Sequence, residues 1–300
     1  MPANPMDLDV RWNHGAPPFR RSTDPLIQTH WIDASTIVLR QSMAINYEAP
    51  FLYLMFGEAR ALLLDTGATS DPASFPLREL VDRLCNEWLA QHPHDDYELV
   101  VAHSHSHGDH IAADGQFADR PRTVLVGHAP SDVAEFFGLI DWPAGEAHFE
   151  LGERRLAVLA IPGHEASSIA IWDPTTELLF TGDTVYPGRL YVHDIAAFQD
   201  SVARLLTFSK LHPVSRVMGA HIEMSNRPGR DYARSVAYHP HEAPLPMTVD
   251  QLRAVVTATR TVATRPGAHR FDDFAIFNGP CESEMARQEL RARIRRLWPF

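Results

Sequence analysis

The stretch His105-Ser106-His107-Gly108-Asp109-His110 carries four side chains able to bind a metal ion within six residues. It follows Leu99-Val100-Val101-Ala102, which predicts a short buried strand, and its glycine indicates a turn. The first two histidines would point to the same side of extended backbone and share one metal, while the carboxylate and the last histidine would face a second. Imidazole and carboxylate ligands suit zinc and similar ions, often with a position left open for water. A catalytic metal site is our first hypothesis, and a solvated histidine-rich loop is the alternative.

Four further apolar runs end in a histidine or an aspartate, so that five predicted strand ends carry a metal-binding side chain. These residues are Asp65 after Ala61 to Leu64, His164 after Leu156 to Ile161, Asp183 after Leu178 to Phe180, and His221 at the end of Ser215 to His221. A lone histidine at any one of these ends would more often be structural, because motif matches carry a large false-positive risk. The occurrence of all five in this order favours a shared metal site over unrelated structural residues.

In this order, the residues resemble the successive motifs of the metallo-β-lactamase superfamily. The resemblance runs from about Ser35 to Glu223, which is most of the chain. It implies an α/β fold of four αββα layers, with the metal site at one edge of the two sheets. A C-terminal helical appendage would complete the fold.

The resemblance also implies which residues hold each metal. His105, His107 and His164 would bind the first ion, Asp109, His110 and His221 would bind the second, and Asp183 would bridge them. Asp65 resembles an aspartate that orients the ligands instead of binding metal. We expect two zinc ions, with manganese or iron as the alternatives.

Such a site predicts hydrolysis. Two neighbouring dications lower the pKa of a bridging water, so that metal-bound hydroxide exists near neutral pH, and one ion polarises the carbonyl or phosphoryl group under attack. Asp109 can accept a hydrogen bond from that hydroxide and later protonate the leaving group. A role as ligand alone is the alternative for this carboxylate.

The identity of the substrate is less clearly indicated. Tyr186 lies three residues after Asp183 and resembles a tyrosine near this offset in the acyl-homoserine lactonases of the superfamily, so we predict that it hydrogen-bonds a substrate carbonyl. A loop tyrosine without a catalytic role is the alternative, and Tyr191 or His193 can line the pocket equally well. Glu165 stands where many members have threonine, which removes a hydroxyl near the site and adds a charge.

The bridging aspartate separates classes within the superfamily. True β-lactamases usually carry cysteine or serine there, so Asp183 argues against antibiotic hydrolysis. Glyoxalase II-like thioesterases share the full ligand set, but no basic and aromatic glutathione-binding segment is recognisable after His221. A hydrolase of carboxylic esters, lactones or thioesters is the leading interpretation.

Three other functions stay open. A phosphodiesterase or nuclease uses the same two-metal core, but a formal charge of −11 disfavours binding to polyanions. A persulfide dioxygenase would use one iron and fewer ligands, and a binding module would be expected to have lost ligands. Two more histidines lie nearby: we expect His103 to pack or support the site instead of binding metal, and His128 is ambiguous.

Composition agrees with a globular enzyme, because 45% of the 300 residues are hydrophobic and 22% are charged. No run approaches membrane-spanning length, and the N-terminus lacks a basic start followed by an apolar segment, so we expect a cytoplasmic protein that binds neither membrane nor nucleic acid. Its partner would be a small-molecule substrate, and homodimerisation stays open. Cys85 and Cys281 cannot form a disulfide framework, and a helical pattern predicts a buried thiol for Cys85.

We divide the chain into an N-terminal arm over residues 1–34, a metallo-β-lactamase-fold domain over 35–235, and a C-terminal loop and helical extension over 236–300 packed on the same domain. Strands are predicted at Thr36–Leu39, Phe51–Phe56 and Ala61–Leu64. Helical spacing of apolar residues predicts helices over Leu77–Leu89, about Ala196 to Lys210, and Glu282–Leu297. Thr248 and Gln251 have the spacing of a capping box. Arginines of the last helix are expected to form a solvated face.

Overall fold

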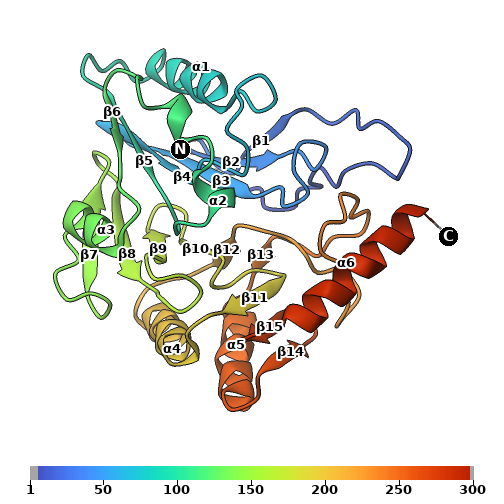
Figure 1. Cartoon of the computed structure of the whole chain (residues 1–300). Coiled ribbons are helices and arrows are strands. Elements are labelled where there is room, and N and C mark those ends of the chain that lie inside the picture. Colours follow the sequence, from blue (N-terminus) through green and yellow to red (C-terminus); the bar gives the residue numbers. More distant parts are fainter. Residues whose placement is uncertain (1–5, 298–300) are drawn as a thin grey trace.

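Two six-stranded sheets face each other between helices in the computed structural model, which describes residues 6–297 and the side chains of residues 6–290 (Figure 1). The first sheet has the strand order β1-β2-β3-β4-β5-β6. Its strands are β1 (Ile27–Trp31), β2 (Thr36–Gln41), β3 (Phe51–Phe56), β4 (Arg60–Leu64), β5 (Glu98–Ala102) and β6 (Thr123–Leu125). The pairs β4/β5 and β5/β6 are parallel, and the others are antiparallel.

The second sheet has the order β13-β12-β10-β9-β8-β7 and is antiparallel except between β10 and β12. Its strands are β7 (Glu146–Glu150), β8 (Arg155–Ala160), β9 (Ile169–Asp173), β10 (Leu178–Gly182), β12 (Arg216–Gly219) and β13 (Pro246–Met247). A small third sheet of order β11-β15-β14 consists of β11 (Arg189–Val192), β14 (Gly267–Arg270) and β15 (Ala275–Asn278).

The described residues form six helices, of which one covers the outer face of the first sheet and two cover the outer face of the second. They are α1 (Leu77–Leu89), α2 (Gly108–Ile111), α3 (Pro130–Phe137), α4 (Ile195–Leu211), α5 (Val249–Val262) and α6 (Glu282–Leu297), with a 3₁₀ turn η1 (Asp114–Gln116). One apolar cluster lies between α1 and the first sheet, a second between the two sheets, and a third between the second sheet and the pair α4 and α5. This confirms the predicted αββα layering. No helix within residues 6–297 is long and apolar enough to cross a membrane.

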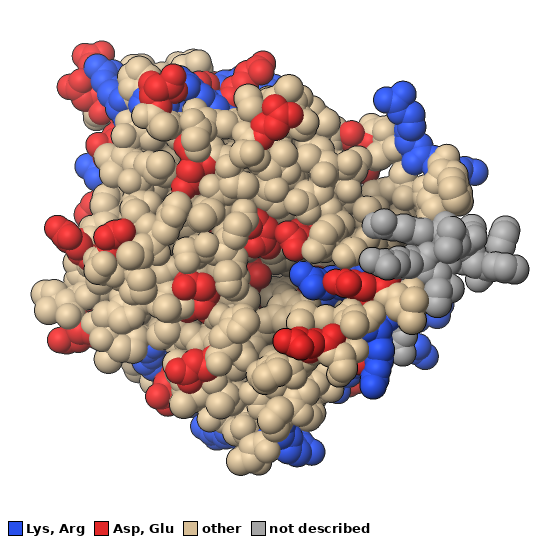
Figure 2. Space-filling view, viewed as in Figure 1, with Lys and Arg blue, Asp and Glu red and all other residues tan. Residues whose placement is uncertain are grey.

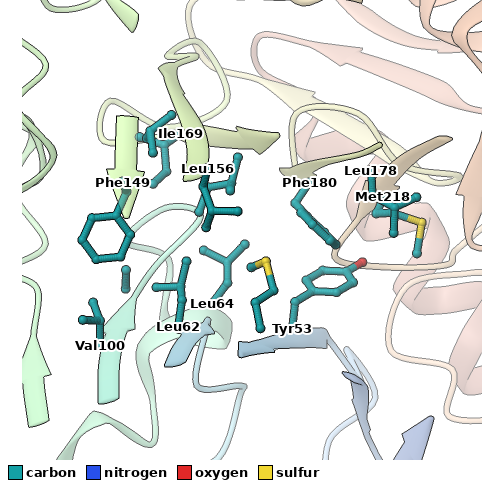
Figure 3. Close-up of a cluster of buried hydrophobic side chains, with 14 of the residues drawn as sticks. Tyr53, Leu62, Leu64, Val100, Phe149, Leu156, Ile169, Leu178, Phe180 and Met218 are labelled. Carbon is teal, nitrogen blue, oxygen red and sulfur yellow. The ribbon is translucent and has the colours of Figure 1, made fainter. Parts of the chain in front are cut away.

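Contacts across the core hold the two sheets together. Tyr53 from β3 and Phe180 from β10 face each other across the gap with ring centroids 4.5 Å apart (Figure 3). The Tyr53 hydroxyl donates a 2.5 Å hydrogen bond to the carbonyl oxygen of Gly219, and the backbone N–H of Phe51 donates to Ala220 O at 2.8 Å. Strand β3 is buried along its whole length, as expected of a strand covered on both faces. These bonds fix the two sheets at the edge where the metal-binding residues gather.

The predicted helices agree closely with the structure. Helix α1 has the predicted bounds and buries its apolar stripe, including the Cys85 thiol. Helix α4 begins one residue earlier than expected, because the carboxylate of Asp194 caps the backbone N–H groups of Ala196 and Ala197 at 3.0 Å. It ends one residue later than expected. Thr248 and Gln251 form the predicted capping box at the start of α5. Helix α6 has the predicted bounds, but the arginines expected to form its solvated face lie outside the described side chains.

The predicted segment boundaries cut through the sheets. Strand β1 falls inside the predicted arm of residues 1–34, yet it pairs with β2 over five residue pairs and extends the first sheet. The C-terminal segment supplies β13 to the second sheet and pairs β15 with β11. Strands β1 and β13 are short edge strands without a strong apolar pattern, so tertiary pairing forms them. Strand β15 is the buried central strand of the third sheet.

Candidate metal centre

The metal-binding residues predicted from the sequence meet at one edge of the two sheets. They lie in loops after the carboxyl ends of strands that run in the same direction within each sheet, which are β4 and β5 in the first sheet and β8, β10 and β12 in the second. Asp109 and His110 lie within the short helix α2, which follows β5 directly. The topology therefore gathers side chains that are up to 156 residues apart, from Asp65 to His221.

Three histidines form the histidine group, which consists of His105, His107 and His164. His107 Nδ1 lies 3.0 Å from His105 Nε2 and 3.0 Å from His164 Nε2, and the two Nε2 atoms are 3.3 Å apart. A neutral imidazole has one N–H, so three nitrogens facing one point leave lone pairs directed at that point. This is the arrangement that a bound cation requires.

The acidic group consists of Asp109, His110, Asp183 and His221. Asp109 Oδ2 lies 3.4 Å from His110 Nε2 and 3.3 Å from His221 Nε2. Asp183 has one oxygen near each group: Oδ1 is 3.4 Å from His221 Nε2, while Oδ2 is 3.8 Å from His164 Nε2. Asp183 is therefore positioned between the two groups, as expected of a bridge.

Hydrogen bonds at the opposite ring nitrogens set the orientation of the histidines. His164 Nδ1 is 2.7 Å from the carbonyl oxygen of Tyr191, and His221 Nδ1 is 2.9 Å from that of Glu48. His110 Nδ1 is 2.9 Å from Asp65 Oδ2. Since these oxygens can only accept, each Nδ1 carries the proton and each Nε2 presents a lone pair to the centre.

Asp65 supports the site as the sequence predicted. Its carboxylate accepts the backbone N–H of Ser104 at 2.6 Å and the Ser104 hydroxyl at 2.8 Å, in addition to the bond from His110. Asp65 has φ of +73°, a conformation in which aspartate is tolerated better than most residues. Gly182 with φ of +51° allows the Asp183 turn to approach, because a Cβ there would lie 2.6 Å from the Ser104 side chain.

The two groups differ in electrostatics. Burial, with repulsion from neighbouring histidines, holds the pKa of His105 well below its ordinary value, and burial lowers the pKa of His164 to about 4. In the acidic group, burial opposes the charged form, but attraction to Asp109, Asp65 and Asp183 outweighs it and raises the pKa of His110. Burial therefore favours neutral rings at His105 and His164, whereas the carboxylates of the acidic group favour a positive charge at their centre, which a bound cation would supply.

These residues fit two divalent metal ions. Imidazole nitrogens and carboxylate oxygens are zinc ligands, and a tetrahedral ion with bonds of about 2.0 to 2.1 Å spaces its ligands by about 3.3 Å, near the distances within both groups. Asp183 Oδ1 is buried and has no hydrogen-bond partner among the described residues. A cation between the groups would satisfy that oxygen.

Five of the seven predicted ligands line one wall of a cavity of about 260 Å³, called here the metal cavity, which lies on the hollowed face seen in Figure 2. They are His107, Asp109, His164, Asp183 and His221. Its other lining residues include Tyr47, Tyr186, Tyr191, His193 and Arg234. The rings of His193 and His107 have centroids 6.1 Å apart. The alternatives named from sequence for the pocket wall, Tyr191 and His193, thus line it together with Tyr186.

The hydroxyl of Tyr186 is directed away from the predicted role. It donates to the carbonyl oxygen of Arg189 and lies 3.1 Å from Glu223 Oε2, and Tyr186 is 1% exposed. Its proton is committed to these partners, so contact with a substrate carbonyl would require this bond to break. The catalytic role of Tyr186 stays a prediction.

Sequence reasoning missed several charged pairs, and three of their members, Arg189, Glu223 and Arg234, line the wall of the metal cavity away from the ligands, called here the far wall. The buried guanidinium of Arg189 pairs with Glu223 and Asp231, and Arg234 lies 3.4 Å from Glu289 on α6. Arg40 from β2 makes two 2.6 Å hydrogen bonds with Glu242 although both side chains are almost fully buried. The spacing from 40 to 242 carries no local signal, so such pairs emerge only in three dimensions.

The remaining sequence candidates lie outside both groups. His103 Nε2 is 2.8 Å from Asp114 Oδ1, and His103 belongs to neither of the two groups. His128 Nε2 contacts the other oxygen of the same carboxylate at 2.7 Å. Glu165 accepts hydrogen bonds from the backbone and hydroxyl of Ser167, and does not line the metal cavity.

Parts of the chain are similar in sequence to curated proteins. The chain is similar to hydroxyacylglutathione hydrolase of Pseudomonas savastanoi pv. phaseolicola, with 34% identity over 127 residues that cover 39% of this chain and 46% of that protein. It is also similar to acyl-coenzyme A thioesterase MBLAC2 of Homo sapiens, with 27% identity over 174 residues that cover 46% of this chain and 59% of that protein. The chain thus spans about half the length of the curated relatives it matches.

Solved structures share the fold. A metallo-beta-lactamase from Pontibacter korlensis superposes with a TM-score of 0.52 at 16% identity, over 78% of this chain and 99% of that chain. The TMB-1 structure gives a TM-score of 0.51 at 14% identity, over 80% of this chain and 100% of that chain. At such identities, the similarity concerns the fold alone.

The family model of the metallo-beta-lactamase superfamily matches residues 48–221, more than half of the chain. That segment contains Asp65 and every residue of the histidine group and the acidic group. The chain therefore belongs to the metallo-beta-lactamase superfamily.

Proposed function

We propose that this protein is a dinuclear metal-dependent hydrolase of carbonyl substrates, with thioesters preferred over carboxylic esters and lactones. The observation that carries the proposal is the position of Asp183, with one oxygen near each of two complete ligand groups at the wall of a cavity. Its similarity to a hydroxyacylglutathione hydrolase and an acyl-coenzyme A thioesterase, both thioester hydrolases by name, supports the preference.

His105, His107 and His164 would hold one ion, Asp109, His110 and His221 the other, and Asp183 both. We propose zinc for both positions. When bound, the pair would supply a nucleophile from water near neutral pH and polarise the carbonyl under attack.

Asp109 is the protein group best suited to move a proton. Its carboxylate lies in the acidic group, yet 19% of its side chain is exposed against 9% for Asp183, so it is the more accessible carboxylate from the metal cavity. Burial opposes its charged form, but attraction from His110 and His221 keeps the pKa of Asp109 below its ordinary range. Asp109 is thus ionised and can accept a proton at Oδ before passing it to the leaving group.

The metal cavity limits what enters it. Its volume of about 260 Å³ is slightly below the range of roughly 300 to 1,000 Å³ typical of sites that enclose a drug-sized ligand. We propose that the acyl group would lie beside the metal ligands and that a large thiol would extend past Tyr47 and Arg234 toward solvent. The acyl portion would therefore be enclosed and the leaving group only partly held.

The decisive experiment compares substrate classes on one preparation of known metal content. The purified protein is assayed with short-chain thioesters, lactones, aryl esters and bis-aryl phosphodiesters, and its metals are measured by elemental analysis. We expect two zinc ions and the highest kcat/KM for a thioester. A clear preference for phosphodiesters would refute the substrate class, and a single iron with no second metal would favour the dioxygenase.

A further inference from the structure

A third set of metal-binding side chains lies beside the dinuclear centre and takes no part in it. This set, called here the His103 cluster, consists of His103, Asp114 and His128. They come from three separate segments: the loop after β5, the turn η1, and the loop after β6. Parallel pairing of β5 with β6 brings the two histidines to the same sheet edge.

The carboxylate of Asp114 lies between the two imidazoles. His103 Nε2 is 2.8 Å from Oδ1, and His128 Nε2 is 2.7 Å from Oδ2. The two rings are nearly perpendicular, with centroids 4.9 Å apart and planes at 82°. One ligand atom from each residue lies within 4.8 Å of the others. Each histidine thus presents a nitrogen to the same small volume.

We propose that the His103 cluster binds a third divalent cation of the zinc class, independent of the dinuclear centre. Two imidazoles and one carboxylate form a donor set that suits zinc and other borderline ions better than calcium or magnesium. Zinc bonds of about 2.0 to 2.2 Å would require the nitrogen and oxygen atoms to separate by about half an ångström from their present distances. Small rotations of the Asp114 carboxylate and of the partly exposed His128 ring would provide this separation.

The surroundings favour a structural ion that reaches its site from solvent. His103 and Asp114 are 5% and 14% exposed, whereas 39% of the His128 side chain is exposed, so water can complete the coordination on that side. Asp114 also accepts a 2.7 Å hydrogen bond from the Thr66 hydroxyl, which lies 3.2 Å from the carbonyl oxygen of His110. An ion at the cluster would therefore tie together β5, β6 and η1, and the Thr66 hydroxyl would connect it to α2 through two hydrogen-bond contacts.

The competing explanation is a hydrogen-bonded His-Asp-His arrangement without metal. It differs from the proposal in how many ions the chain holds. His128→Gln separates the two, because an amide can still donate to Asp114 but is a poor zinc ligand. His103→Gln is the second variant. His148→Gln is the matched control, since His148 is 44% exposed and lies 3.8 Å from one carboxylate, Glu146.

The test is equilibrium dialysis of the untagged full-length protein against Zn²⁺, followed by elemental analysis and circular dichroism. We expect wild type and His148→Gln to hold one zinc more per chain than His128→Gln and His103→Gln, with thioesterase activity kept in His128→Gln. Equal zinc content in wild type and folded His128→Gln would overturn the proposal in favour of the hydrogen-bonded arrangement. A loss of more than one ion in His128→Gln would also overturn it, because the cluster would then serve the dinuclear centre.

Discussion

The two walls of the metal cavity are built in different ways. The metal-binding wall consists of short side chains at strand ends within residues 105–221, and backbone carbonyl oxygens hold the second ring nitrogens of His164 and His221. The far wall, which includes Tyr47, Arg234 and Met285, comes from a loop and from the segment after His221, and it depends on long side chains such as Arg234 that pair across distant segments. The first wall is suited to hold reacting atoms, and the second to select what reaches them.

The largest effect should follow from breaking the bridge in the metal-binding wall. Asp183→Asn replaces a charged carboxylate that contacts both groups with a neutral amide, so both ions should be held less tightly. We expect hydrolysis to fall by more than the roughly 10²-fold that marks the upper end for loss of an outer partner, with metal content reduced in elemental analysis. Asp194→Asn is the control, because asparagine also caps a helix. Full metal content and full activity in Asp183→Asn would refute the bridging assignment.

A smaller effect should follow from loosening one ligand without removing it. Asp65→Asn keeps the shape of the side chain but weakens its bond to His110 Nδ1. We expect zinc affinity to fall by about 10- to 100-fold, measured by competition with a chelator. Asp71→Asn changes an exposed carboxylate a few residues away and should leave affinity unchanged. Identical affinity in both variants would show that Asp65 does not orient the ligand.

Tyr186 also lines the metal cavity, and a variant at this position tests whether its hydroxyl takes part in catalysis. Tyr186→Phe should lower kcat by up to about 10²-fold with unchanged metal content if the hydroxyl leaves Arg189 O to stabilise a developing oxyanion. Steady-state kinetics of thioester hydrolysis, together with elemental analysis, measure this. An unaltered kcat with a loss of about 1 kcal/mol in unfolding free energy would instead assign the hydroxyl to its buried hydrogen bond alone.

The smallest effect is expected in the far wall. Arg234 is a cation at the cavity that is about one-third exposed and paired with Glu289 at 3.4 Å. Arg234→Met should raise KM for thioesters of anionic thiols by up to about fivefold, the equivalent of one exposed ion pair, with kcat unchanged. Arg227→Met, an exposed arginine outside the cavity, should change neither. A kcat decrease in Arg234→Met, or an equal KM rise with neutral thioesters, would contradict a role in charge selection.

The sequence by itself determined the metal-binding wall. Its ligands follow apolar runs such as Leu99 to Ala102, and a buried strand that ends in a polar turn is a local pattern, visible in a few consecutive residues. The same holds for α1 and for the capping box of Thr248, since helix periodicity and caps depend on neighbours three or four residues apart. Such features require no knowledge of the rest of the chain.

Only the tertiary structure decided the far wall, the edge strands and the His103 cluster. Arg40 meets Glu242 across 202 residues, and Arg154 crosses between the sheets to bond Asp173 at 2.6 Å and the carbonyl oxygen of Phe56 at 2.8 Å. His103 and His128 became neighbours because β5 pairs with β6, which no spacing of 25 residues predicts. A contact between distant residues depends on how every intervening strand packs. Such a contact therefore produces no periodic pattern in the sequence from which it could be predicted.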